Sequence, residues 1–163
     1  MELQKKNMKI KITPSVLFLF LSLKIQAQIK VAGDITNPGE LALETFPVKR
    51  IGNIAIRNHV GLKKNSLKKA NGILLKDGLN QFTLSDNLPK NYSRYVYTIT
   101  ASDGYTVTFS WNELFNNNVG KKVFLVTHSK SHPKDGIILI SKSDRFTGRR
   151  FVKDVVEIHI ERK

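Results

Sequence analysis

Arginines gather near the C-terminus of the chain, where three guanidinium groups fall within six residues. They are Arg145, Arg149 and Arg150, with Thr147 and Gly148 between them. The planar guanidinium fork matches phosphate and carboxylate groups, and glycine lets the backbone approach an anion closely. We therefore expect Arg145, Thr147, Arg149 and Arg150 to bind an anionic ligand or cofactor. The alternative is a solvated loop whose arginines pair with Asp144 and Asp154.

A histidine in the first half of the chain is a second candidate for ligand contact. His59 stands between Arg57-Asn58 and Val60-Gly61, after a predicted strand. A protonated imidazole pairs with an anion, and a neutral one donates or accepts a hydrogen bond. An ordinary loop histidine remains the alternative for this position.

The other titratable candidates have simpler explanations. His128 and His132 are four residues apart, but Pro133 disfavours the helix that would bring their rings together. The sequence offers no clear third ligand near them, so we expect no metal site. Asp103 precedes Gly104, and a turn already accounts for that pair. We therefore predict no catalytic residue.

An aromatic-rich segment, residues 95–111, is expected to form a β-hairpin. Its larger apolar residues fall on odd positions on both sides of Ser102-Asp103-Gly104. A two-residue loop would set Ile99 opposite Thr108, whereas a three-residue loop sets it opposite Val107. Glycine also suits the left-handed position of the longer turn. We predict the longer loop and one buried face, with these aromatic members: Tyr95, Tyr97, Tyr105, Phe109 and Trp111.

Short strands are predicted on both sides of this hairpin. They cover residues 29–35, 51–57, 123–127, 137–140 and 155–160, the last with Val156, Ile158 and Ile160 on one face. Residues 61–71 carry four lysines and are predicted to form a solvated loop. Residues 73–79 should begin extended and end as a helix. A capping box, Ser110 with Glu113, predicts another helix over 111–115. The pattern indicates an α+β fold, a β-rich mixed-sheet domain with one or two short helices.

The first 27 residues have the pattern of an export signal. Lys9 and Lys11 precede an apolar run over residues 16–23, and a polar segment follows with Ala27 placed for cleavage. This run is shorter than the roughly 20 residues that cross a bilayer. We expect residues 1–27 to be a signal peptide and 28–163 a single domain, periplasmic or secreted, without stable membrane insertion. An uncleaved anchor is the alternative, and Met8 is an alternative start to Met1.

The predicted exported domain is strongly basic. The whole chain carries a formal charge of +14, and the signal holds five lysines and one acidic residue, which leaves +10. A charge of this sign favours anionic partners. Because an exported protein is separated from nucleic acid, we expect the partner to be an anionic small molecule, an acidic protein or the membrane surface, and no nucleic acid. The chain contains no cysteine, which excludes disulfides and thiolate metal ligands.

Four segments, in order along the chain, carry a family resemblance. They are residues 29–35 followed by Asn37-Pro38-Gly39, residues 72–77 ahead of a helix, Ala101-Ser102-Asp103-Gly104-Tyr105, and residues 144–152 ahead of the last strand. Their order and spacing resemble the sulfite oxidase-type molybdopterin-binding domain, in particular its short exported members. The resemblance implies a β-rich α+β fold of that type and molybdopterin as the cofactor. It also places His59 at the edge of the cofactor site.

The chain departs from the catalytic members of that family at their metal ligand. These members bind molybdenum through a cysteine in the region that here reads Ile56-Arg57-Asn58-His59-Val60-Gly61. Neither Asn58 nor His59 replaces a soft thiolate. We therefore expect a non-catalytic module that binds an anionic ligand, such as a pterin phosphate, or a protein partner. The alternative is a molybdenum-cofactor oxidoreductase component that acts without the usual cysteine and is completed by another subunit.

Overall fold

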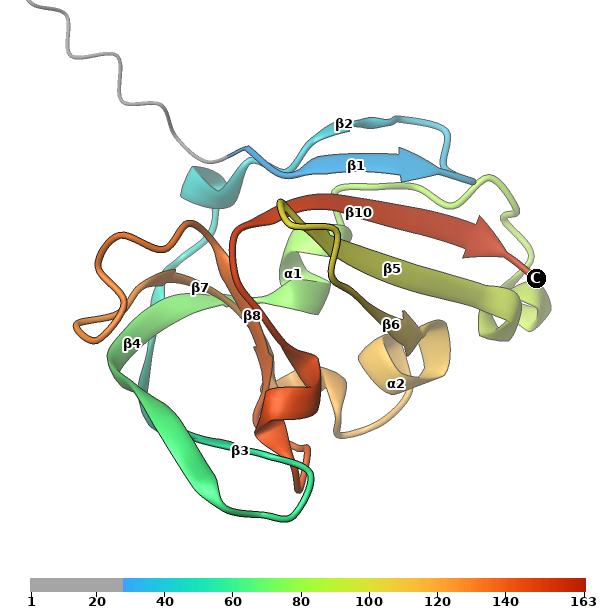
Figure 1. The fold of residues 1–163 in the computed structure, drawn as a ribbon. Helices are drawn as coiled ribbons and strands as arrows, with labels where there is room; N and C mark the ends of the chain where they lie inside the picture. The colour runs from blue at the N-terminus through green and yellow to red at the C-terminus, as the bar shows by residue number, and fades with distance from the viewer. Residues whose placement is uncertain (1–27) are drawn as a thin grey trace, which may run out of the picture.

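A computed structural model describes residues 28–163, which form two β-sheets around a shared core (Figure 1). The expected signal peptide, residues 1–27, lies outside the described residues. Strands make up most of the regular structure, and the helices are short. The predicted strand-rich α+β architecture is therefore confirmed.

The first sheet joins strands from the beginning, middle and end of the described chain. In spatial order they are β2 (Gly39–Glu40), β1 (Lys30–Gly33), β10 (Val155–Arg162), β5 (Tyr95–Ala101) and β6 (Thr106–Ser110). The β1 and β10 strands are parallel, and the other neighbours are antiparallel. This sheet is therefore mixed, as the sequence predicted.

The second sheet is antiparallel throughout. Its strands, in spatial order, are β3 (Lys49–Arg57), β4 (Lys63–Leu74), β7 (Val123–His128), β8 (Ile138–Ser141) and β9 (Phe151–Val152). The prediction of a solvated loop over residues 61–71 was wrong, because most of that segment belongs to β4. Its lysines are exposed, but Leu67 and Ala70 are fully buried and hold the strand against the core.

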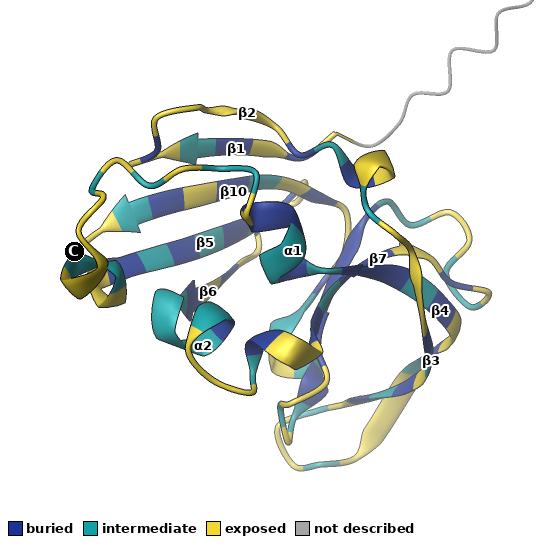
Figure 2. Cartoon of the chain, turned by 180° about the vertical axis from the view of Figure 1, so that it is seen from behind, coloured by how far each residue is buried: buried dark blue, intermediate teal, exposed yellow. Residues whose placement is uncertain are grey.

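The helices are single turns or little more. They are α1 (Leu75–Leu79), α2 (Trp111–Phe115) and four 3-10 helices, η1 (Leu43–Thr45), η2 (Pro89–Arg94), η3 (Gly120–Lys122) and η4 (Thr147–Arg150). The predicted capping box is present, since Ser110 and Glu113 each accept a hydrogen bond from the other's backbone N–H. Figure 2 shows α1 and α2 beside β5 and β6. No helix within residues 28–163 is long and apolar enough to cross a membrane.

The central hairpin has the predicted register. Tyr97 lies opposite Phe109 and Ile99 opposite Val107. The N–H of Ala101 donates to the carbonyl of Tyr105 at 2.9 Å, which closes the three-residue loop. Two aromatic residues that were predicted on the buried face of the hairpin are placed elsewhere. Trp111 leaves the ladder to start α2, and Tyr105 is exposed.

The last strand carries an irregularity that the alternation of apolar residues did not reveal. A register shift between Val155 and Glu157 buries Val155 and turns Val156 outward. Ile158 and Ile160 are buried as predicted, but the expected burial of Val156 was wrong. A bulge of this kind changes which side chains face the core without changing the sequence pattern that follows it.

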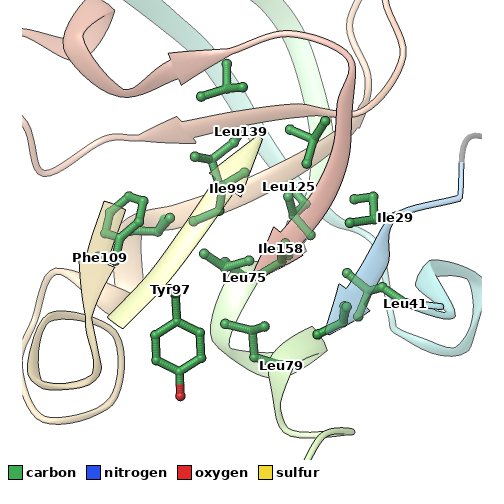
Figure 3. Packing of buried hydrophobic residues seen from close by; sticks show 14 of the residues in the cluster. Ile29, Leu41, Leu75, Leu79, Tyr97, Ile99, Phe109, Leu125, Leu139 and Ile158 are labelled. Carbon is green, nitrogen blue, oxygen red and sulfur yellow. The ribbon is translucent and has the colours of Figure 1, made fainter. Parts of the chain in front are cut away.

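The main core fills the space between the two sheets (Figure 3). The buried side chains of β5, β6 and β10 meet those of β7 and β8, with Leu75 and Leu79 of α1 among them. A second, smaller cluster covers the other face of the second sheet. The β8 strand is therefore buried on both faces, which explains its continuous apolar run, Ile137 to Ile140.

Close contact between β4 and β7 depends on a glycine. A Cβ atom at Gly72 would lie 2.1 Å from the carbonyl oxygen of Leu125, closer than real contacts permit. We expect Gly72→Ala to lower the free energy of unfolding by about 3 kcal/mol or more, because the two backbones must separate. Urea unfolding measures this, with Gly39→Ala as the control, since nothing lies within 4 Å of its Cβ position. Equal losses in the two variants would contradict the prediction.

Candidate functional site

The arginine segment forms η4, and its backbone packs against the end of β3. The hydroxyl of Thr147 donates to the carbonyl of Ala55 at 2.7 Å and accepts from the N–H of Arg57 at 2.9 Å. A Cβ atom at Gly148 would lie 2.7 Å from the carbonyl oxygen of Arg57. Thr147 is buried, and its hydroxyl is occupied by these backbone bonds. The residue therefore positions η4, and its hydroxyl is not turned toward a ligand.

Arg150 is the most constrained of the three arginines. Its Nε and Nη2 atoms donate to Asp144 at 2.8 and 2.7 Å, and Nη1 donates to Glu113 at 2.9 Å. The guanidinium also lies 4.1 Å from the centre of the Phe109 ring. The hydrogen bonds that Arg150 donates to Asp144 raise the pKa of Arg150 above its ordinary value. The alternative in which the arginines pair with Asp144 and Asp154 is therefore confirmed in part for Arg150, which pairs with Asp144.

The solvated-loop alternative expected the arginines to pair with Asp144 and Asp154. Within residues 28–163, neither Arg145 nor Asp154 takes part in such a pair. The Arg145 guanidinium is exposed and lies 5.2 Å from the centre of the Phe146 ring. The carboxylate of Asp154 instead accepts a hydrogen bond from the backbone N–H of Gly136. Arg145 is also absent from the walls of the cavity that Arg149 lines.

Arg149 and His59, which are far apart in the sequence, line one cavity of about 400 Å³. Its walls come from the end of β3, the β3–β4 loop, the start of β4, the β5–β6 turn and η4. The lining residues are Ile56, Arg57, Asn58, His59, Lys64, Tyr105, Gly148 and Arg149. The structure thus brings together two of the five predicted binding residues and leaves Arg145, Thr147 and Arg150 outside the lining.

The loop that carries His59 is held by its own hydrogen bonds. The side-chain oxygen of Asn58 accepts from the N–H groups of Val60 and Leu62, at 3.2 and 2.9 Å. Gly61 has a φ of +84°, and its carbonyl accepts from Nη1 of Arg57 at 3.0 Å. Glycine suits this left-handed conformation. His59 is therefore an exposed side chain on an ordered turn.

The β5–β6 turn supports the opposite wall. The hydroxyl of Tyr105 donates to the carbonyl of Arg149 at 2.8 Å, which ties η4 to the hairpin. Tyr105 was predicted to pack into the core, and that prediction was wrong. It is 46% exposed, because the residue follows Gly104 at the tip of the turn, beyond the edge of the core.

The lining of this cavity is positively charged and contains no acidic side chain. Arg57, Lys64 and Arg149 are its cationic side chains, and none of the three makes an ion pair with the described residues. No carboxylate belongs to the lining. Adjacent cations with no acidic neighbour create a positive potential that attracts anions. Guanidinium, ammonium and phenol groups together offer several donors to phosphate or carboxylate oxygens.

Sequence reasoning missed Arg57, Lys64 and Tyr105 as lining residues. Arg57 was noted only as a neighbour of His59. Lys64 was placed in a solvated loop. The β3–β4 register sets Arg57 opposite Lys63, so pairing these two strands could have revealed the charge at this end of the sheet.

A second basic hollow, of about 620 Å³, lies on the same β3–β4 hairpin. Four lysines line it: Lys63, Lys68, Lys69 and Lys130. Consecutive residues Lys63 and Lys64 line different cavities, as expected when successive side chains of a strand point to opposite faces. The hairpin is therefore basic on both sides.

The donor set does not fit molybdenum as the catalytic members of the resembling family bind it. The chain has no cysteine to supply a thiolate. Within residues 28–163, no group of three or more His, Asp or Glu side chains could hold a metal ion. His132 instead pairs with Asp135, its Nδ1 3.0 Å from the carboxylate. The residues at the 400 Å³ cavity suit the oxygen atoms of an anion.

No protein-family model matches this chain, and no curated protein matches it either.

Arg150 should be required for stability. We expect Arg150→Met to lower the free energy of unfolding by roughly 2 kcal/mol or more, because Asp144 and Glu113 would keep their charges without a counter-ion. The matched control is Arg145→Met, which removes an exposed guanidinium with no acidic partner and should change stability little. Chemical denaturation of both variants tests the difference. Similar unfolding midpoints would show that the Arg150 network contributes nothing.

Acid should weaken the same network. Burial alone would raise the pKa of Glu113, but hydrogen bonds from Ser110 and Arg150 lower it below its ordinary value of 4.5. A carboxyl whose pKa is lower in the folded state stabilises the fold above its unfolded pKa, and this contribution is lost as pH falls through the folded pKa. Stability should therefore decline below about pH 4.5, and less steeply in Glu113→Gln. Parallel pH profiles for the two proteins would contradict this.

Proposed function

We propose that this protein is a non-catalytic module that binds a phosphate- or carboxylate-bearing ligand in the cavity between the β3–β4 loop and η4. One observation carries the proposal. Arg57, Lys64, Arg149 and His59 converge from separate segments on one cavity whose lining contains no carboxylate. The three cationic side chains create a positive potential that attracts an anion into this cavity.

Arg149 is the residue best prepared to contact the ligand. Its backbone is fixed, because η4 is held to β3 through Thr147 and to the hairpin through Tyr105. Its guanidinium is exposed and makes no ion pair, so both edges of the fork are available to an anion. A rigid backbone with a free fork reduces the ordering that binding requires.

The net charge supports capture of an anion over distance. The chain after residue 27 carries +10, and the basic β3–β4 hairpin places part of this charge around the cavity. Positive potential of this kind raises the association rate of anionic ligands and weakens as salt concentration increases. Acidic side chains of a protein partner would meet the same donors.

The family resemblance makes the proposed ligand more specific. Our assignment is to an exported, cysteine-lacking member of the sulfite oxidase-type molybdopterin-binding fold, supported by the order of its four resembling segments. The phosphate of a pterin then falls within the ligand class of the cavity. The lining supplies cationic and hydrogen-bonding groups but no thiol that could bind molybdenum, which supports a binding role.

Ligand binding can be tested with pyrophosphate as the probe. Calorimetric titration at near-physiological salt should show saturable binding to the wild-type protein. Arg149→Gln should weaken it about tenfold, because one charge-assisted contact is lost. Arg145→Gln is the matched control, since it removes the same charge from the same loop outside the cavity. It should bind as the wild type does.

The two arginine variants separate a specific site from general attraction. Equal weakening in both would mean that net charge alone governs binding, and the proposed cavity would be rejected. Absence of saturable binding to the wild type would also reject a site for phosphate groups. Binding of an acidic peptide in place of pyrophosphate, lost only in Arg149→Gln, would assign the cavity to a protein partner.

The non-catalytic assignment predicts little bound molybdenum. We expect the full chain, purified from a host that makes molybdopterin, to carry far less than one molybdenum atom per chain, because no thiolate ligand exists. Elemental analysis with cofactor fluorescence measures both components. Stoichiometric molybdenum would overturn this assignment in favour of an oxidoreductase component. Pterin fluorescence without metal would identify the anion.

A further inference from the structure

A smaller cavity, of about 260 Å³, lies where α2 and η2 meet the first sheet, and it has no lining residue in common with the basic site. Aromatic rings form much of its wall. They belong to Phe82, Tyr92, Tyr97, Trp111 and Phe115. These residues come from separate parts of the chain, so the cavity is a product of the tertiary fold.

The rings support one another. Trp111 and Phe115 are stacked with their centres 5.6 Å apart, and Tyr92 lies 5.5 Å from Trp111 at a tilt of 51°. Tyr97 lies 5.9 Å from Phe115. The capping box at Ser110 fixes the start of α2, which carries Trp111 and Phe115. Such contacts hold the aromatic wall in place without a ligand.

The hydroxyl of Tyr97 is a polar group of the cavity wall that is available to a ligand. This residue is only 2% exposed, yet its oxygen makes no hydrogen bond to the described residues. Figure 3 shows the oxygen pointing away from the aliphatic core side chains. Tyr95, two residues earlier, is different, because its hydroxyl contacts Ser85 at 3.2 Å and Asp86 at 3.0 Å. The Tyr97 oxygen is not fully enclosed by protein atoms, so it opens onto the cavity and is free to bond a group that enters there.

Three properties of the cavity limit which molecule could bind beside this hydroxyl. The cavity is smaller than the roughly 300 Å³ at which pockets for drug-sized ligands begin, so it suits a single ring. Its aromatic wall favours a planar ring. No acidic residue lines it, and the protein is strongly basic, so a cationic ligand is disfavoured. Burial also raises the pKa of Tyr97, so its hydroxyl stays protonated.

We propose that this cavity binds a neutral, single-ring aromatic molecule whose one polar group forms a hydrogen bond with the Tyr97 hydroxyl. The ring would pack against Trp111 and Phe115, and the polar group would be directed to the wall formed by β5. This site is separate from the anion cavity and does not depend on the function proposed for it.

Trp111 makes the proposal directly measurable, because it is the only tryptophan in the chain and it lines the cavity. Titration of the full chain with p-cresol should change Trp111 fluorescence in a saturable way. Toluene, which has the same ring without the hydroxyl, should bind about tenfold more weakly, since it leaves Tyr97 unpaired. Free N-acetyltryptophanamide controls for collisional quenching.

Tyr97→Phe is the decisive variant, because it removes one oxygen and keeps the buried ring. The preference for p-cresol over toluene should disappear in this variant, because no hydroxyl is left to bond the ligand or to lose its water when toluene binds. Thermal unfolding confirms that the variant folds, and backbone NMR shifts at Phe82 and Phe115 locate the ligand. Unsaturable quenching, or a preference that persists in Tyr97→Phe, would overturn the proposal. Arg149→Gln should not affect p-cresol binding, which keeps this test independent of the anion site.

Discussion

The guanidinium group of Arg150 connects parts of the protein that no strand pairing joins. It contacts Asp144 in the segment between β8 and β9 of the second sheet, Glu113 in α2, and the Phe109 ring on the first sheet. Both oxygens of each carboxylate are engaged, since Asp144 also accepts from Ser141 and Glu113 from Ser110. Removal of one charge from such a network leaves others uncompensated, so the two sheets and α2 depend on it together.

Arg149 and Arg150 are neighbours in sequence but have different surroundings, because η4 is a 3-10 helix. Successive side chains of such a helix point in directions about 120° apart. Arg150 therefore turns into the structure, while Arg149 turns outward to the basic cavity. Thr147 and Gly148 hold the same turn against β3. A structural arginine thus fixes the backbone from which the exposed one can meet a ligand.

The central hairpin contributes to both cavities, at opposite ends of its strands. Tyr105, at the turn, supports the basic cavity through its bond to the Arg149 carbonyl. Tyr97 and Trp111, toward the other end, form part of the aromatic wall. Between them, Ile99 and Val107 belong to the main core. Packing of this middle section keeps both ends in place, so one hairpin supports the core and lines two cavities.

Local patterns in the sequence determined the hairpin register, the capping box at Ser110 and most of the strands, because each depends on neighbouring residues or on strict alternation. They also predicted Arg149 and His59 as binding residues, and the structure places both in the lining of one cavity. Only the tertiary structure decided which arginine and lysine side chains pair with an acidic residue and which line the cavity without one. Asp144 and Glu113 reach Arg150 from separate elements, and Lys64 reaches the cavity because buried Leu67 and Ala70 make β4 a strand. Long-range pairing and the bulge in β10 depend on distant packing, which single-chain periodicity does not encode.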